Sequence, residues 1–240
     1  MCENLKELDI LKENNILEKC DITLLEKNLK IYQLKEGFRF SVDPIILVDF
    51  FQGKPEGKIL DIGSGCGIIP ILLAEKKGMK NICGVEIQEE SLELFKKNIE
   101  ENNLSDRITV YGGDVADLKE GNSFDYIISN PPYMTLDGKK ISENENKKIA
   151  RHEISLDLKK LVENSKRLLK PRGEFFLVHR SYRFLEICSE LEKNGFSVKR
   201  VKFSFFDRDK SSNLVLIQAS KGRKHKLEIE SPLFLEEKGY

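Results

Sequence analysis

Two short segments of the 240-residue chain carry residue types that could hold a small molecule beside a reacting group. The first, Asp61 to Gly67, has the pattern D-x-G-x-G-x-G and stands where an apolar run gives way to a helical pattern. Glycines let a backbone approach a ligand closely, and the following helix offers unpaired N–H groups to an anion. A dinucleotide motif would need glycine in place of Ile68, and the Gly-Lys-Ser/Thr ending of a P-loop is absent. The segment therefore predicts another class of ligand site, with a purely structural turn as the alternative.

Two acidic residues follow the next two expected strands. Glu86 ends an apolar run 25 residues after Asp61, and Asp114 follows a Gly-Gly pair. A carboxylate in the first position suits the two hydroxyls of a ribose, and one in the second could face the exocyclic amine of an adenine. Either acid alone could be a solvated loop residue, but their places after successive strands favour a shared nucleoside site.

The second segment is Ser129-Asn130-Pro131-Pro132-Tyr133, at the end of a further apolar run. Its two prolines fix the backbone and remove two N–H donors, which leaves carbonyl groups facing outward. The Asn130 side chain and the Pro131 carbonyl would accept hydrogen bonds from the NH2 group of an amide or a base, and Tyr133 would stack on the ring. This arrangement would direct the nitrogen towards an electrophilic carbon, whereas the structural alternative is a rigid Pro-Pro turn.

Alternating strand and helix patterns must position these residues. Strands are expected at 58–61, 82–86, 108–111, 124–129 and 174–178, and helices around 71–74 and at 89–103, 155–169 and 182–194. Residues 131–150 are predicted to form a loop, and Lys170-Pro171-Arg172-Gly173 a helix stop before a strand. Two β-rich runs, 197–206 and 213–219, follow each other as an expected antiparallel pair. The alternation predicts an α/β fold with a mostly parallel sheet and helices on both faces, whose ligands lie at the carboxyl ends of the strands.

Composition limits the class of protein. A 27.6 kDa chain with 40% hydrophobic residues can bury a core without a metal or a disulfide. Five cysteines form no C-x-x-C pair, the charged N-terminus shows no leader pattern, and no apolar run reaches the ~20 residues that span a bilayer. We therefore expect a cytoplasmic protein that binds no membrane and, with only His152, His179 and His225, no metal. The sequence leaves the oligomeric state open and is compatible with a monomer.

Together the glycine segment, the two acids and Asn-Pro-Pro-Tyr resemble the class I S-adenosylmethionine-dependent methyltransferases that methylate amines. The resemblance covers about residues 35–220 and implies a Rossmann-like, seven-stranded, mostly parallel sheet with an antiparallel C-terminal strand pair. We therefore expect a methyltransferase domain over residues 37–240, with a basic C-terminal stretch. Residues 1–36 have a mixed composition that indicates only an N-terminal accessory segment.

The same resemblance implies S-adenosylmethionine as cofactor and assigns a role to each matching residue. The methionine part would face Asp61, Gly63, Ser64, Gly65 and Gly67; the ribose would face Glu86; and the adenine would face Asp114 and Val115. The catalytic residues would be Asn130, Pro131, Pro132 and Tyr133, which hold the target amine, with Asn130 also bordering the cofactor. The amine would attack the sulfur-bound methyl group directly, forming an N–C bond as the C–S bond breaks, so no histidine or cysteine is expected to act as a catalytic base.

Three further stretches are similar to the bacterial tRNA(Val) adenine-N6-methyltransferase family. They are residues 37–47, residues 150–153, and residues 212–216 followed by 221–224. This resemblance implies tRNA as partner and the adenine just 3′ of the anticodon as target. Guanine N2 of ribosomal RNA, a protein glutamine and a non-catalytic RNA-binding role remain alternatives. The short leading segment disfavours the glutamine enzymes, and the intact motifs disfavour a non-catalytic homologue.

Charge is distributed unevenly, although the formal net charge is zero. Residues 84–126 hold 11 acids and 4 basic residues, a net of −7, whereas residues 195–226 hold 9 basic residues and 2 acids, a net of +7. A solvated lysine-rich surface would give the same count, but an RNA substrate favours a phosphate-binding face. Its expected members are Arg200, Lys202, Arg208, Lys210, Lys221, Arg223, Lys224 and Lys226.

Overall fold

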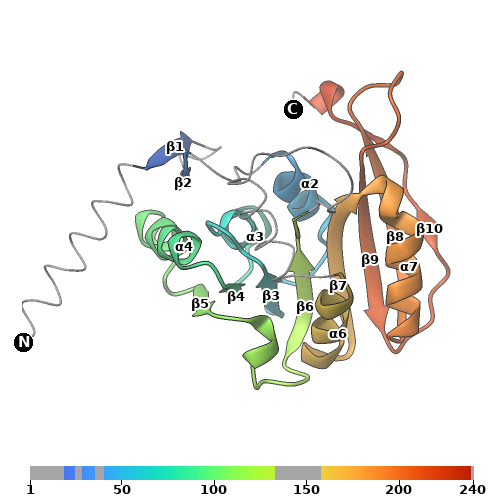
Figure 1. The fold of residues 1–240 in the computed structure, drawn as a ribbon, viewed down its shortest axis with the longest axis horizontal. Coiled ribbons are helices and arrows are strands. Elements are labelled where there is room, and N and C mark those ends of the chain that lie inside the picture. The colour runs from blue at the N-terminus through green and yellow to red at the C-terminus, as the bar shows by residue number, and fades with distance from the viewer. Residues whose placement is uncertain (1–18, 25–28, 36–40, 133–157, 239–240) are drawn as a thin grey trace, which may run out of the picture.

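A nine-stranded sheet forms the centre of the computed structural model, which describes residues 19–24, 29–35, 41–132 and 158–238 (Figure 1). Its seven longer strands lie in the order β8-β9-β7-β6-β3-β4-β5, and β10 and β11 both pair with the outer strand β8. The strands are β3 (Lys58–Ile62), β4 (Asn81–Glu86), β5 (Ile108–Gly112), β6 (Phe124–Ser129), β7 (Leu169–Arg180), β8 (Phe196–Phe205), β9 (Leu214–Lys221), β10 (Glu228–Ile229) and β11 (Leu233–Phe234). Among these strands only β9 runs antiparallel to its neighbours. The predicted α/β class and the antiparallel C-terminal pair are confirmed.

Helices cover both faces of the sheet because its strand residues are apolar on both sides. Ile59 contributes to the core beneath α2 (Asp43–Phe50), α3 (Ile68–Lys77) and α4 (Glu89–Glu101). The next residue, Leu60, contributes to the core beneath α6 (Leu158–Leu168) and α7 (Phe184–Lys193). Three short 3₁₀ turns complete the described helices: η2 (Val115–Asp117), η3 (Ser181–Arg183) and η4 (Glu236–Lys238). Continuous apolar strands of this kind are typical of parallel sheets covered on both sides.

The strand expected at 174–178 is longer than predicted, because β7 begins at Leu169. Helix α6 does end at Leu168, so the predicted helix stop is confirmed, but the following Lys-Pro-Arg-Gly segment already belongs to the strand. Arg172 adopts a left-handed φ of 67°, and the pairing of β7 with β6 changes register between Phe124 and Tyr126. The start of β7 is thus an irregular, bulged strand, and the predicted strand start at residue 174 was wrong.

The N-terminal part contributes a separate antiparallel hairpin, β1 (Cys20–Leu24) and β2 (Lys30–Leu34), which lies near α4 in Figure 1. Cys20, Tyr32 and Leu34 pack with Leu94 of α4 and with Cys66. The hairpin therefore contacts the glycine-rich segment, a contact that the sequence did not indicate.

Candidate active site

The carboxyl ends of neighbouring strands bring the predicted site residues to one edge of the sheet. Asp61 on β3 pairs with Ile128 on β6 and with Gly84 on β4, and Glu86 at the end of β4 pairs with Gly112 on β5. Asn130 follows β6 directly. The structure thus places the glycine loop, Glu86, Asp114 and Asn130 along one edge, as the sequence predicted.

The glycine loop, residues 63–67, needs its glycines for two different reasons. Gly65 has a φ of 56°, and a Cβ there would meet nothing within 4 Å, so backbone conformation and open space, rather than packing, favour glycine. Gly67 has a φ of 87° and begins α3, and a Cβ there would lie 2.0 Å from the Phe95 ring. Helix α3 has no side-chain cap at its N-terminus. The loop therefore presents an accessible backbone surface beside a helix N-terminus that suits an anionic group.

Glu86 lies across the mouth of this loop and is only 5% exposed. One carboxylate oxygen accepts a hydrogen bond from the Gly65 N–H at 2.8 Å, and the other accepts from the Gln88 N–H at 2.8 Å. These bonds fix the carboxylate and leave further lone pairs on both oxygens. A fixed carboxylate with spare acceptor capacity is suited to a pair of ribose hydroxyls.

Asp61 is a fully buried carboxyl group, and among the described residues neither of its oxygens has a hydrogen-bond partner. Burial raises its pKa to about 8; a contact with Ser64 opposes this rise, and the negative charge of Glu86 adds to it. The Ser64 hydroxyl itself donates to the Asp61 backbone carbonyl at 3.1 Å. An orphaned buried carboxylate is costly unless a ligand supplies a donor or a positive charge. We infer that Asp61 is suited to bind a positively charged group of a ligand.

Asp114 is placed less specifically than the other acids. Its Oδ1 accepts a hydrogen bond from the Ala116 N–H at 2.9 Å and so caps η2, while Val115 is buried. The preceding Gly113 N–H donates to the Glu86 backbone carbonyl at 2.9 Å, which ties this turn to the end of β4. The arrangement holds one carboxylate oxygen in a capping bond and places the residue beside Glu86.

The proline corner begins at Ser129, whose side chain is completely buried. The Ser129 hydroxyl donates to the Ile62 carbonyl at 2.8 Å and fastens the end of β6 to the end of β3. Asn130 and Pro132 are half-buried and Pro131 is buried, whereas Tyr133 lies outside the described residues. The base of the corner is therefore fixed relative to the glycine loop through two adjacent strands.

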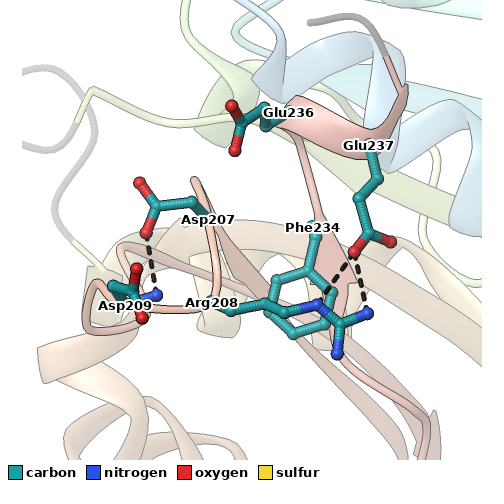
Figure 2. A pocket seen from close by; sticks show the side chains of 6 residues that line it. All are labelled: Asp207, Arg208, Asp209, Phe234, Glu236 and Glu237. Carbon is teal, nitrogen blue, oxygen red and sulfur yellow. Dashed lines mark hydrogen bonds and ion pairs between the residues drawn. The ribbon is translucent and has the colours of Figure 1, made fainter.

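Two pockets occur in the described part of the chain, and neither includes a residue predicted to bind the cofactor or the target amine. Figure 2 shows the first, with a volume of about 270 Å³, which four carboxylates and Arg208 line together with Phe234. Arg208 donates to Glu237 at 2.8 Å and lies over the Phe234 ring. The second, about 250 Å³, includes Arg200 and Glu230. Their mixed charges indicate surface ion pairs rather than a nucleoside site.

The predicted phosphate-binding face is not continuous in the structure. Arg200 and Lys202 both bind Glu230, at 2.6 and 3.1 Å, and Arg200 is only 5% exposed. Arg208 and Lys210 form ion pairs with Glu237 and Asp207. The other members, at 221–226, lie at the far end of β9, because β9 runs antiparallel to β7 and so away from the carboxyl edge. The prediction of one face was wrong, because a count of charges does not reveal which cations face carboxylates.

Arg200 is held within the fold by several side-chain and backbone partners. Besides Glu230, it donates to the Gln218 side chain at 2.8 Å and to the Phe50 carbonyl at 2.6 Å, and it stacks on the Phe50 ring at 3.9 Å. We expect Arg200→Ala to lower the free energy of unfolding by about 3 kcal/mol, since breaking a buried ion pair leaves its partners unsatisfied. Urea denaturation measures this loss. An unchanged midpoint together with weakened RNA binding would instead support the original assignment.

Burial shifts the pKa of one histidine and one cysteine strongly. Burial, followed by the charge of Arg183, lowers the pKa of His179 to about 4. Burial raises the pKa of Cys66 to about 12. His152 lies outside the described residues. No group of metal-ligating side chains occurs among the residues with a described position.

One contact to the glycine loop was not predicted. Asn98 of α4 is completely buried and donates to the Cys66 carbonyl at 2.8 Å. Its only sequence signal is its place on the buried side of α4, beside Leu94, Phe95 and Ile99. A polar residue at such a position implies a specific hydrogen-bond partner but does not say which one.

Comparisons with known proteins identify related sequences. Residues 42–202 match the family model described as methyltransferase small domain. The tRNA1(Val) (adenine(37)-N6)-methyltransferase of Dyadobacter fermentans is 29% identical over 216 residues, which cover 88% of each chain. The enzyme of the same name from Porphyromonas gingivalis is 32% identical over 161 residues, 63% of this chain and 62% of that one.

Solved structures share the fold at low sequence identity. A predicted O-methyltransferase from Agrobacterium tumefaciens matches with a TM-score of 0.64 at 18% identity, covering 80% of this chain and 86% of that one. TYW2 of P. horikoshii, solved in complex with MeSAdo, matches with a TM-score of 0.61 at 14% identity, covering 85% and 72%. Among the described helices, none has both the length and the apolar composition that crossing a bilayer requires.

Proposed function

The chain belongs to the methyltransferase small-domain family, and on this premise we propose that it methylates the N6 amine of adenine 37 in tRNA1(Val), using S-adenosylmethionine. The observation that carries the proposal is the pairing of β3 with β6. It places Asp61 and the glycine loop next to the Asn130 corner. A donor of methyl groups and an acceptor amine would therefore meet between two adjacent strand ends.

The residues present fit S-adenosylmethionine. When bound, this cofactor supplies a methyl group on a positively charged sulfur atom. Asp61 offers a buried carboxyl group without a hydrogen-bond partner among the described residues, and in its ionised form this group would bind the ammonium of the methionine part. Glu86 would hold the ribose hydroxyls, and the open space over Gly65 admits the ligand against bare backbone. Asp114 and Val115 would border the adenine of the cofactor.

The chain's contribution to the reaction would be to position and polarise the target amine. An adenine NH2 is a weak nucleophile because its lone pair is delocalised into the ring. The Asn130 side-chain oxygen and the Pro131 carbonyl would accept hydrogen bonds from its two N–H groups, favour a pyramidal nitrogen, and stabilise the positive charge that grows on it. We propose that Tyr133 stacks on the base. No side-chain base is required, since the methylated amine can lose its proton to water.

A second proposal concerns the cations that remain uncompensated. Arg223, Lys224 and Lys226 are exposed and form no ion pair with any described residue. Nearby groups report their positive field: burial and then Lys166 lower the pKa of Lys221, and burial and then Arg223 lower that of His225. We propose that this cluster, Lys166 with residues 221–226, contacts tRNA phosphates at some distance from the target base.

Removing three of these cations should therefore affect binding and not chemistry. We expect the triple variant Arg223→Ala, Lys224→Ala, Lys226→Ala to raise the Kd for tRNA and to reduce the slope of log affinity against log salt by about 2, at unchanged kcat. The matched control is Arg208→Ala with Lys210→Ala, whose cations already have acidic partners. Fluorescence anisotropy at several salt concentrations measures the Kd and the salt slope of each variant, and transfer of labelled methyl groups to tRNA measures kcat. A flat salt dependence of the unaltered chain would contradict the cluster.

A tRNA substrate would place the protein in the cytoplasm. The substrate assignment can be tested in cells. We expect nucleoside mass spectrometry of tRNA from cells without the gene to lack one N6-methyladenosine, mapped to position 37 of tRNA1(Val). A missing methylated guanosine in ribosomal RNA, or a missing methylated glutamine, would identify one of the alternative acceptors. Unchanged RNA and protein methylation would favour a non-catalytic role.

A further inference from the structure

Hydrogen bonds hold every residue of the glycine loop. Three of these residues are held by backbone groups: Gly63 and Ser64 donate to the Val85 carbonyl at 3.0 and 3.1 Å, and the Gly67 N–H donates to the Ser64 carbonyl at 2.9 Å. The other two, Gly65 and Cys66, are held by side chains, namely Glu86 and Asn98. Glu86 borders the proposed ligand, whereas Asn98 reaches the loop from α4. Asn98 is therefore a loop-holding side chain with a role separate from ligand contact.

The Asn98 amide holds the N-terminal hairpin with the same group. Its Oδ1 accepts a hydrogen bond from the Tyr32 N–H at 2.7 Å, and its Nδ2 donates to the Tyr32 carbonyl at 2.9 Å and to the Cys66 carbonyl at 2.8 Å. Both amide hydrogens and the oxygen are thus engaged, in a side chain with no exposed surface. One amide joins strand β2 to the glycine loop.

A second asparagine, one helical turn later, bonds to the hairpin but not to the described glycine loop. Asn102 accepts from the Lys30 N–H at 3.0 Å and donates to the Lys30 carbonyl at 2.8 Å. The spacing is geometrically matched, because four helical residues rise about 6.0 Å and two strand residues about 6.6 Å. The two asparagine side chains therefore bind the backbone N–H and C=O groups of alternate residues of β2, as a neighbouring strand would. Among the described residues, Asn98 alone of the two has a hydrogen bond to the glycine loop.

We propose that Asn98 is a positioning residue of the cofactor site, and that hairpin β1–β2 docks behind the glycine loop as a working part of that site. The proposal rests on the proposed function, because it takes the loop to hold S-adenosylmethionine. The bond to Cys66 fixes the peptide that precedes Gly67, where the backbone turns through a φ of 87° into α3. Since hairpin and loop share one amide, we expect docking of the hairpin and binding of the cofactor to favour each other, and any such coupling is reciprocal.

The test compares the two asparagines by calorimetry with S-adenosylhomocysteine. We expect Asn98→Ala to raise its Kd about tenfold and Asn102→Ala to change it less than about twofold, while the KM for tRNA stays unchanged in both. Both variants lose hairpin bonds, so a merely structural role would lower both melting temperatures and leave the affinity of the folded chain unaltered. Equal affinities in Asn98→Ala and the unaltered chain would overturn the proposal, as would equal losses in the two variants.

A second measurement needs no substitution and so avoids any failure to fold. Hydrogen exchange of a peptide covering residues 29–34 should slow at least about threefold when S-adenosylhomocysteine is added, because the Tyr32 N–H donates to Asn98. Unchanged exchange at ligand saturation would contradict the coupling. An unaltered chain that binds no S-adenosylhomocysteine would contradict the proposed function itself, whereas normal binding with an unaffected Asn98→Ala variant would contradict only the role of Asn98.

Discussion

Replacing Asn130 by alanine should lower kcat for methyl transfer by roughly 10²–10³-fold and leave the Kd for S-adenosylhomocysteine within about threefold of the unaltered value. The magnitude is that of removing one hydrogen-bonding group from a preorganised reacting centre. The expected loss falls on kcat because the Asn130 oxygen would stabilise charge that develops only as the amine reacts. Transfer of labelled methyl groups to tRNA, with calorimetry for the cofactor, measures both quantities.

Two further variants make the Asn130 result specific. Asn130→Asp keeps an oxygen acceptor at the same distance from the backbone, so it should retain more activity than Asn130→Ala. Asn81→Ala removes an asparagine from the opposite, amino-terminal edge of the sheet, where its side chain donates to the Glu56 carbonyl. This control should transfer methyl groups normally. Full activity in Asn130→Ala would contradict the clamp on the amine.

The second large effect concerns Asp61→Asn, which should stabilise the ligand-free chain and weaken cofactor binding roughly 100-fold. The folded pKa of about 8 lies above the unfolded value of about 3.9. The carboxyl group therefore costs folding free energy, and this cost grows as pH rises from about 4 to about 8 and is constant above that. Asparagine carries no charge and removes the cost. The lost affinity reflects the removal of a buried negative charge opposite a cationic ligand group.

Melting temperatures at pH 6 and pH 8 test whether the Asp61 carboxyl group costs more folding free energy at the higher pH. The gain in stability of Asp61→Asn over the unaltered chain should be larger at pH 8, by about 2 kcal/mol or roughly 5 °C in melting temperature. The other titrating groups are common to both proteins, so their contributions cancel in this comparison. The unaltered chain should also release a proton on binding S-adenosylhomocysteine at pH 7, because a cationic ligand lowers the Asp61 pKa. An advantage that is equal at both pH values would show that Asp61 is already ionised in the ligand-free state.

Asp125→Asn is the matched control, because this carboxyl group sits on β6 and has partners. Partial burial acts to raise its pKa, but hydrogen bonds from Lys170 and from the Lys58 N–H lower it. A lowered folded pKa stabilises the chain at all pH values well above it. Asp125→Asn should therefore destabilise the protein equally at pH 6 and pH 8, and it should leave cofactor affinity unchanged.

Most of the sheet and much of the site could be predicted from local sequence patterns. Gly65 and Gly67 could be read from spacing because a strand-to-helix turn of this shape requires left-handed backbone, and the proline corner is likewise a local feature. Such features depend on a few consecutive residues, so the sequence alone can reveal them. The order of the strand ends then follows from general rules for parallel sheets.

Long-range pairing could not be read in the same way. Asn98 holds Cys66 and Tyr32, which are 32 and 66 positions away, and Arg200 holds Glu230, 30 positions away. Nothing in the flanking residues of either side chain identifies its partner. The early start of β7 is a related case, because it depends on a register change against β6 rather than on β propensity. Partners of buried polar residues emerge only once the strands and helices are assembled.

The most direct test of the central claim is methylation in vitro of a tRNA1(Val) transcript, with the product digested and identified by nucleoside mass spectrometry. The Asn130 corner and the glycine loop, brought together by β6 and β3, should yield N6-methyladenosine at position 37, and a transcript with guanosine at that position should accept no methyl group. Methylation that persists on the guanosine transcript, or that appears as a methylated guanosine, would contradict the account.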